Sequence, residues 1–94
     1  MKSILIAVVA SLSLIAAGAA SAQEALAKSS GCLNCHAVDT KKVGPGFKEV
    51  ATKYKGKADA QTTLEAKLTS GKGHPAVKTS ADDVKSLVKW ILSL

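Results

Sequence analysis

Apolar residues recur along this chain with the period of an α-helix. Residues 47–54 and 84–91 each place apolar side chains at positions i, i+3, i+4 and i+7, which brings them onto one helix face. Leu64 and Leu68 lie one turn apart within residues 61–70, where we expect another helix, and residues 24–30 are expected to form a short first one. No stretch alternates apolar and polar residues as a half-buried strand does. The pattern predicts an all-α fold of about four short helices.

Glycine, proline and serine mark the boundaries of these helices. Gly56 and Gly71 follow the second and third helices, at the position where glycine commonly ends a helix. Ser80 precedes the last helix, and we expect its side-chain oxygen to cap the first turn. Residues 37–46 and 72–79 lack periodicity and contain glycine and proline, so they are predicted to be loops.

The first 22 residues differ in composition from the rest of the chain. A lysine precedes a mostly apolar run, and Ala20-Ser21-Ala22 then supplies a small-x-small pattern. This arrangement predicts a signal peptide over residues 1–22, cleavage before Gln23 and one exported domain over residues 23–94. The alternative is an uncleaved anchor, because the apolar run with its small-residue end approaches the ~20 residues that span a bilayer. The small residues and the polar sequence that follows favour cleavage.

The predicted domain is too short and too poor in bulky side chains to form a large core. Its aromatic residues are Phe47, Tyr54 and Trp90. A chain of this length buries a marginal core by itself. We therefore expect a bound apolar group to fill its centre.

The motif with a recognisable chemical role is Gly31-Cys32-Leu33-Asn34-Cys35-His36. C-x-x-C-H is the attachment signature of a c-type haem. On a helical turn Cys32 and Cys35 share one face, so both sulfurs can reach one edge of a flat macrocycle and form thioethers with its vinyl groups. His36 follows directly and can offer an imidazole nitrogen to the iron. The motif predicts one covalent haem c, held by both cysteines, with His36 as the proximal iron ligand.

Three other interpretations of the cysteine pair are weaker. A thioredoxin-like redox pair belongs beside a βαβ pattern, which this sequence lacks. A structural zinc site needs four ligands, and only His74 remains beyond the motif itself. A disulfide across two intervening residues closes a very short loop and contributes little stability.

Three residues outside the motif are candidates for the haem environment. Pro45 has a carbonyl that is free to accept a hydrogen bond from the second ring nitrogen of His36; alternatively, it only stiffens its loop. Leu64 and Leu68 are expected to face the haem, and ordinary contact between helices is the alternative.

The residues from Gly31 to Lys57 resemble the small bacterial class I cytochromes c that carry electrons in respiration, and Leu87–Leu94 resembles their terminal helix. The resemblance implies the cytochrome c fold: helices around one haem, crossed first and last helices and an exposed porphyrin edge. It implies that Cys32 and Cys35 link the haem, that His36 is the proximal ligand and that Pro45 is its hydrogen-bond acceptor. It also implies haem attachment after export, in the periplasm.

The sequence departs from this family at the distal iron ligand. The usual ligand is a methionine, but the only methionine here is Met1, and the loop before that position is shortened to Ser70–Gly73. His74 precedes Trp90 by the spacing at which the family places its methionine, and Pro75 follows it as a proline follows that methionine. We therefore predict bis-histidine ligation by His36 and His74. The alternatives are an exposed loop histidine over a vacant or water-bound iron, or a lysine ligand, Lys72 or Lys78, which must first lose a proton.

The charge excess comes entirely from lysine. The chain has 13 basic residues and no arginine, against 7 acidic residues, a formal net charge of +6. A basic surface favours acidic redox proteins, or a membrane-bound reductase or oxidase, through electrostatic steering. By analogy with the family, Lys41, Lys42 and Lys72 are expected near the exposed haem edge. Nucleic acid is not an expected partner, and the alternative is a lysine coat that serves solubility alone.

These features predict a monomeric, periplasmic, mono-haem cytochrome that transfers single electrons between redox partners. It is not expected to be an enzyme, because no catalytic base, nucleophile or phosphate-binding loop is found. One alternative is a haem protein that binds NO, CO or a peroxide at a labile sixth position. Another is a haem-bearing subunit or maturation factor of a larger reductase.

Overall fold

The computed structural model describes residues 20–94. Most of the predicted signal peptide, residues 1–22, lies outside this part of the chain, and its cleavage remains a prediction. The helical elements are an N-terminal helical segment over residues 20–29, the 3₁₀ turn η1 (Cys32–Asn34), α2 (Phe47–Tyr54), α3 (Ala60–Ser70) and α4 (Ala81–Leu92). Residues 20–94 contain no strand, so the predicted all-α class is confirmed.

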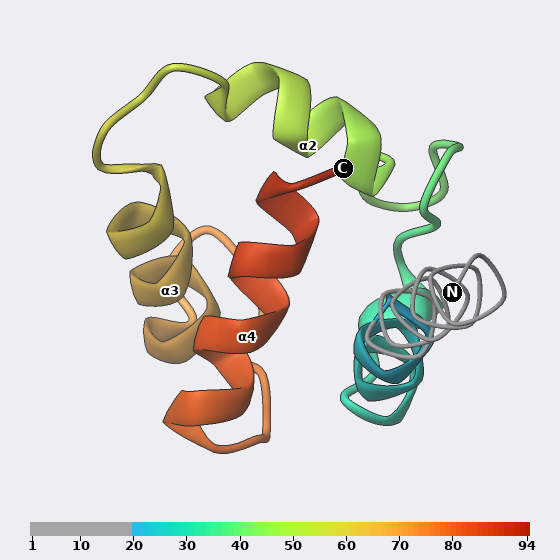
Figure 1. The fold of residues 1–94 in the computed structure, drawn as a ribbon. Coiled ribbons are helices and arrows are strands. Elements are labelled where there is room, and N and C mark those ends of the chain that lie inside the picture. Colours follow the sequence, from blue (N-terminus) through green and yellow to red (C-terminus); the bar gives the residue numbers. More distant parts are fainter. Residues whose placement is uncertain (1–19) are drawn as a thin grey trace, which may run out of the picture.

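Helix α4 lies in the middle of the molecule and contacts the other helices. Figure 1 shows it between α3 on one side and the N-terminal helical segment on the other, with α2 near its C-terminal end. Leu26 and Ala27 of the N-terminal segment pack against the cluster that contains Leu87 and Ile91 of α4. The first and last helices therefore pack together, as the family resemblance implies.

The core forms on the apolar face of α4 that the sequence pattern predicts. The residues of this stripe are all buried: Val84, Leu87, Val88 and Ile91. Ala27 and Phe47 join two of them in one cluster, which links α4 to the N-terminal segment and to α2. Burying a side chain of this size stabilises a fold by roughly 1.5–3 kcal/mol. Because so few large side chains contribute, the core of the described chain is small.

The predicted helix ends are present. The Ser80 side chain accepts a hydrogen bond of 3.1 Å from the backbone N–H of Asp83, and this capping satisfies a donor in the first turn of α4. Gly71 ends α3 in the left-handed conformation, with φ of +73°, which glycine adopts without the steric cost of a side chain.

Two helices begin earlier than the sequence pattern predicts. The N-terminal segment is already helical at residue 20 rather than residue 24. Alanine and glutamine in this stretch have good helix propensity, and no proline interrupts it. Helix α3 begins at Ala60, one residue before the predicted start, because the N–H of Thr63 donates to the carbonyl of Asp59 at 2.9 Å and closes an additional turn.

Within residues 20–94, no helix combines the length and the apolar character needed to span a bilayer.

Candidate functional site

A cavity of about 420 Å³ opens between α2, α3, α4, the η1 turn and the loop that follows α3. Its walls are mostly apolar. Every residue that the sequence analysis placed in the haem site lines this cavity: Cys32, Cys35, His36, Pro45, Leu64, Leu68 and His74. The fold therefore collects these side chains from four separate parts of the chain around one space.

The η1 turn positions the two cysteines. Gly31 precedes it with φ of +85°, a left-handed conformation that favours glycine, and the N–H of His36 donates to the carbonyl of Cys32 at 3.0 Å. Both cysteines line the cavity and form no disulfide with each other; Cys32 is half-buried and Cys35 is exposed. Burial raises the pKa of the Cys32 thiol, so this sulfur stays protonated rather than becoming the thiolate that disulfide exchange requires.

The His36 ring is fixed by three neighbours. Its Nδ1 donates a hydrogen bond of 2.6 Å to the carbonyl of Pro45, the acceptor that the sequence analysis expected. The ring stacks on Phe47 with centroids 5.2 Å apart. On Gly44, an added Cβ would lie 2.5 Å from Cε1 of His36, so the backbone there lies directly against the imidazole. Because Nδ1 carries the hydrogen, Nε2 keeps a lone pair that can bind a metal.

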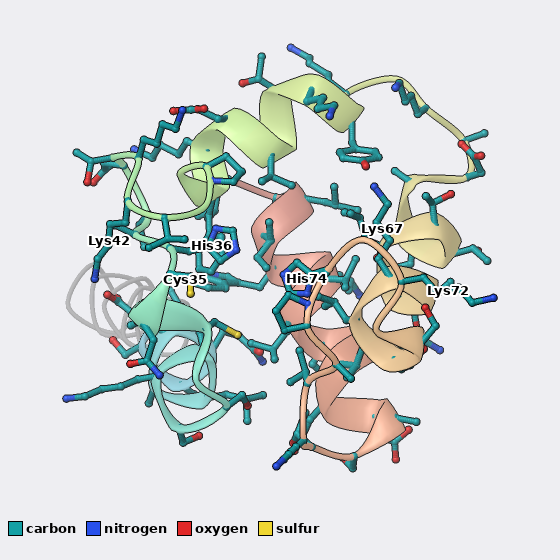
Figure 2. The ribbon with its side chains drawn as sticks, turned by 180° about the vertical axis from the view of Figure 1, so that it is seen from behind. Cys35, His36, Lys42, Lys67, Lys72 and His74 are labelled. Carbon is teal, nitrogen blue, oxygen red and sulfur yellow. The ribbon has the colours of Figure 1, made fainter. Side chains whose placement is uncertain are left out.

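His74 lies on the loop between α3 and α4 and has the same tautomer. Its Nδ1 donates a hydrogen bond of 2.7 Å to the carbonyl of Pro75. The His74 and His36 rings are nearly parallel, with an interplanar angle of 11° and centroids 6.1 Å apart. Figure 2 shows the two side chains close together, reaching the cavity from opposite parts of the chain. Two imidazoles, each with an available Nε2, thus share one cavity.

Several lining residues were not identified as site residues from the sequence. Phe47, Val50 and Tyr54 belong to the apolar stripe of α2, which the sequence pattern assigned to a core. Lys53 and Lys67 also line the cavity, and Nζ of Lys67 donates to the Tyr54 hydroxyl at 3.4 Å. No local sequence signal distinguishes these two lysines from the others. Only the packing of α2 beside α3 places them there.

The lysines that family analogy placed near the haem edge do not line the cavity. Lys41, Lys42 and Lys72 are exposed and absent from its walls. Lys42 instead donates a hydrogen bond of 3.0 Å from Nζ to the carbonyl of Leu33 and so ties its loop to the η1 turn. In Figure 2, Lys67 and Lys72 lie on the side of the molecule that carries His74, and Lys42 lies near Cys35.

The competing interpretations of the cysteines find no support in the described chain. Residues 20–94 contain no group of three or more histidine, cysteine or acidic side chains placed to bind a metal ion by themselves. This part of the chain also has no strand that could form a thioredoxin-like unit.

The donor set fits a haem. Two thiols lie at one edge of the cavity, two imidazoles with available Nε2 atoms face into it, and leucine and valine side chains form apolar walls. Two lysines and a tyrosine at the rim can accommodate carboxylates. The cavity also adjoins the small core, where the sequence analysis expected a bound group to supply missing apolar bulk.

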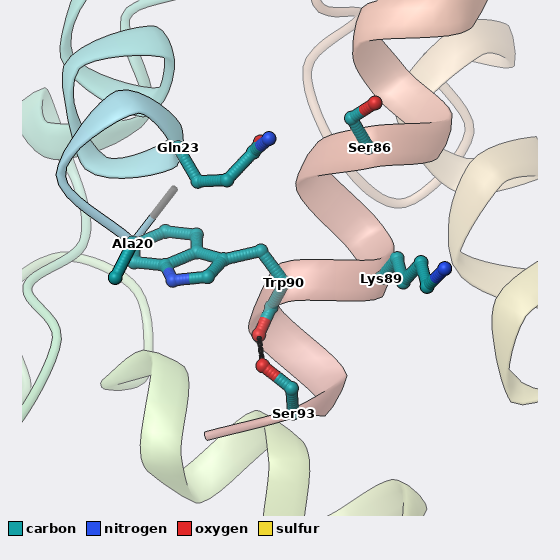
Figure 3. A pocket seen from close by; sticks show the side chains of 6 residues that line it. All are labelled: Ala20, Gln23, Ser86, Lys89, Trp90 and Ser93. Atoms are coloured by element: carbon teal, nitrogen blue, oxygen red, sulfur yellow. Dashed lines mark hydrogen bonds between the residues drawn. The ribbon is translucent and has the colours of Figure 1, made fainter. Parts of the chain in front are cut away.

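A second, more open hollow of about 460 Å³ lies between the N-terminal helical segment and α4 (Figure 3). Its lining contains no cysteine or histidine: Ala20, Gln23, Ser86, Lys89, Trp90 and Ser93. It therefore lacks the ligands that distinguish the first cavity.

Comparison with known proteins agrees with this site. The sequence model of the cytochrome c family matches residues 15–94. Cytochrome c-552 of Nitrosomonas europaea is 40% identical, over 100% of this chain and 99% of the relative. Cytochrome c-551 of Pseudomonas aeruginosa is 40% identical, over 87% of this chain and 92% of the relative.

Solved structures agree as well. The class 1 cytochrome MtoD of Sideroxydans lithotrophicus superimposes with a TM-score of 0.72 at 41% identity, over 78% of this chain and 92% of that protein. Wild-type cytochrome c552 of Nitrosomonas europaea superimposes with a TM-score of 0.67 at 40% identity, over 76% of this chain and 98% of that protein. With its C-x-x-C-H turn on the wall of a mostly apolar cavity, the chain belongs to the cytochrome c family, among the small bacterial class I members.

Proposed function

We propose that this cytochrome is a periplasmic electron carrier whose haem iron is bound by both His36 and His74. As a member of its family, the chain carries one covalently attached haem c and transfers single electrons between redox partners. One observation carries the proposed ligation: the two imidazoles lie nearly parallel, 6.1 Å apart, in the same cavity. Imidazoles that share one metal ion, with metal–nitrogen distances of ~2.0–2.1 Å, have centroids roughly 6 Å apart.

The hydrogen bonds of both rings support the same ligation. A ligating histidine commonly donates its other ring N–H to a carbonyl, which fixes the tautomer and the ring orientation. His36 donates to Pro45 and His74 donates to Pro75, both through Nδ1. Each ring therefore keeps an unprotonated Nε2, which would be available to bind the haem iron.

Lysine ligation is less consistent with the geometry. Lys72 and Lys78 are both exposed, and neither lines the cavity. A lysine ligand would also have to lose a proton whose usual pKa is about 10.4. His74 already lines the cavity, so it needs no rearrangement toward the site.

The residues around the cavity have roles that suit electron transfer. When bound, the haem supplies an iron whose potential depends on its axial ligands and surroundings. Leu64, Leu68 and Leu87 limit the access of water to the site, which keeps its electrostatic environment fixed. Cys35 is exposed, so the part of the haem attached to it would lie near solvent, where an electron could pass to a partner over a short distance.

The ligation is tested by replacing His74. We expect His74→Ala to lose the six-coordinate low-spin spectrum of the unmodified protein and to bind CO readily in the ferrous state. We expect His74→Met to raise the reduction potential, on the order of a hundred millivolts within the ~0.8 V that axial ligands cover. Optical spectra and potentiometric titration measure both effects. Lys72→Ala, on the same loop, serves as the control, and an unchanged spectrum in His74→Ala would refute the assignment.

The position of the His36 ring is tested at Gly44. An alanine there would place Cβ 2.5 Å from Cε1 of the ring, so the imidazole must rotate or shift. We expect Gly44→Ala to alter the ligand field in electron paramagnetic resonance and to lower the thermal stability of the haem protein. Gly46→Ala is the matched control, because the atoms nearest to its Cβ would be backbone atoms of Asp39 and Thr40, at 3.1–3.3 Å, and not the imidazole. Equal spectra for the two variants would contradict a positioning role for Gly44.

The basic rim supports an acidic redox partner. Lys53 and Lys67 line the cavity, and the chain has a net charge of +6. We expect Lys53→Glu to slow electron transfer to an acidic partner by about two- to tenfold at low ionic strength, through slower association. Lys85→Glu on α4 makes the same change in net charge away from the cavity and should have a smaller effect. The stopped-flow rates of the unmodified protein and both variants should converge at about 1 M salt, where charges are screened beyond ~3 Å. Rates that do not depend on salt concentration would argue against electrostatic steering.

The predicted signal peptide supports the proposed periplasmic location, and its cleavage is tested by intact mass. Because Ala20-Ser21-Ala22 precedes Gln23, we expect the purified protein to begin at Gln23 and to carry one haem. Retention of residues 1–22 would overturn cleavage but not haem attachment. A mass equal to that of the bare polypeptide would overturn attachment through Cys32 and Cys35.

A further inference from the structure

We infer that His74 is an exchangeable ligand, and that this site takes up a small uncharged molecule of the CO or NO class in its place while His36 stays bound. The inference rests on the proposed ligation by both histidines and adds a second binding activity to the carrier. Its basis is a difference between the two histidines, which have similar rings and tautomers but are attached to the fold in different ways.

His36 is held by contacts with distant parts of the chain. Its acceptor, Pro45, lies nine residues further along, so the ring cannot move away without breaking a link between two segments. The segment that carries Pro45 is itself fastened: the N–H of Gly44 donates to Cys35 at 2.7 Å, and the N–H of Phe47 donates to Ala37 at 2.9 Å. Once Cys35 is linked to the haem, the neighbouring His36 is further constrained.

Within residues 20–94, the hydrogen bond of the His74 ring stays inside its own loop. Its Nδ1 donates to the carbonyl of Pro75, the next residue, so the donor and the acceptor move together. Moving the loop therefore leaves this hydrogen bond intact and adds no cost for an unpaired ring N–H. Nothing comparable to the links of His36 restrains the ring of His74 within residues 20–94.

The loop has points at which it can move. Gly71 and Gly73 both have positive φ, of +73° and +74°, on the N-terminal side of His74. Glycine accepts a wider range of backbone angles than other residues, and Gly73, which directly precedes His74, lines the cavity. On the other side, the N–H of Val77 donates to the carbonyl of Leu68 at 2.8 Å and anchors the loop to α3. Residues 71–76 can therefore shift while both ends stay in place.

The surroundings of the cavity indicate the class of ligand. Leu64, Leu68, Ala76 and Val77 line it together with His74. The charged residues of its lining, Lys53 and Lys67, are exposed and come from α2 and α3, not from the loop that carries His74. An apolar pocket imposes little desolvation cost on a neutral diatomic molecule and a large one on an anion. In the exchange, the bond between Nε2 of His74 and the haem iron would break, and a bond between the iron and the incoming ligand would form. The oxidation state of the iron would not change, and no other reactant would be needed.

The test is CO binding to the dithionite-reduced haem protein, followed by stopped-flow spectroscopy. We expect a CO complex whose rate of formation levels off at high CO concentration, because His74 must first dissociate. His74→Ala should give the same final CO spectrum, but its rate of formation should stay proportional to the CO concentration. Pro75→Ala keeps the carbonyl acceptor and removes the restriction that proline places on residue 74, so the limiting rate should rise several-fold. Lys78→Ala, on the same loop but outside the cavity, should leave that rate unchanged.

The outcomes separate this inference from the ligation on which it rests. A bis-histidine spectrum before CO addition, followed by no binding over hours at saturating CO, would overturn exchange and leave the ligation standing. Binding without a limiting rate, in a protein whose starting spectrum is not bis-histidine, would overturn both. A limiting rate that Pro75→Ala leaves unchanged but Gly44→Ala raises would show that His36 is the ligand lost, and would also overturn the inference.

Discussion

The packing of the apolar face of α4 is the interaction on which the rest of the structure depends. Leu87 and Ile91 join Ala27 and Phe47 in one cluster, and the same two residues form part of the cavity wall. The burial that holds the helices together thus also shapes the haem site. Loss of buried volume at Leu87 would affect both, since a leucine-to-alanine change in a core typically costs about 2–5 kcal/mol.

Because the same residues form the core and the cavity wall, haem binding is coupled to the stability of the fold. The core contains few large side chains, and a cavity of about 420 Å³ adjoins it. A group that occupies the cavity in the folded state alone stabilises that state by mass action, and covalent attachment through Cys32 and Cys35 makes the occupancy permanent.

The two histidines illustrate how similar ligands acquire different roles from their attachments. His36 is linked through Pro45, Phe47 and Gly44 to separate parts of the chain, whereas His74 is hydrogen-bonded only to its neighbour Pro75. Ligand strength is a property of the imidazole, but exchange depends on how many contacts must break for the ring to leave. In the proposed ligation, one firmly held histidine and one histidine on a short glycine-containing loop would make only the second one exchangeable.

The sequence by itself determined the elements and most of the chemistry. The stripe on α4, the Ser80 cap and the C-x-x-C-H turn are local patterns, because helix periodicity, capping and attachment spacing each operate within a few residues. Only the tertiary structure decided which distant side chains meet. Lys53 and Lys67 were indistinguishable from the other lysines until the packing of α2 and α3 placed them on the cavity, whereas Lys41, Lys42 and Lys72 stayed outside it. The contact of Gly44 with His36, the parallel rings of His36 and His74, and the difference in their attachment likewise depend on how loops far apart in sequence fold against each other, which no local pattern encodes.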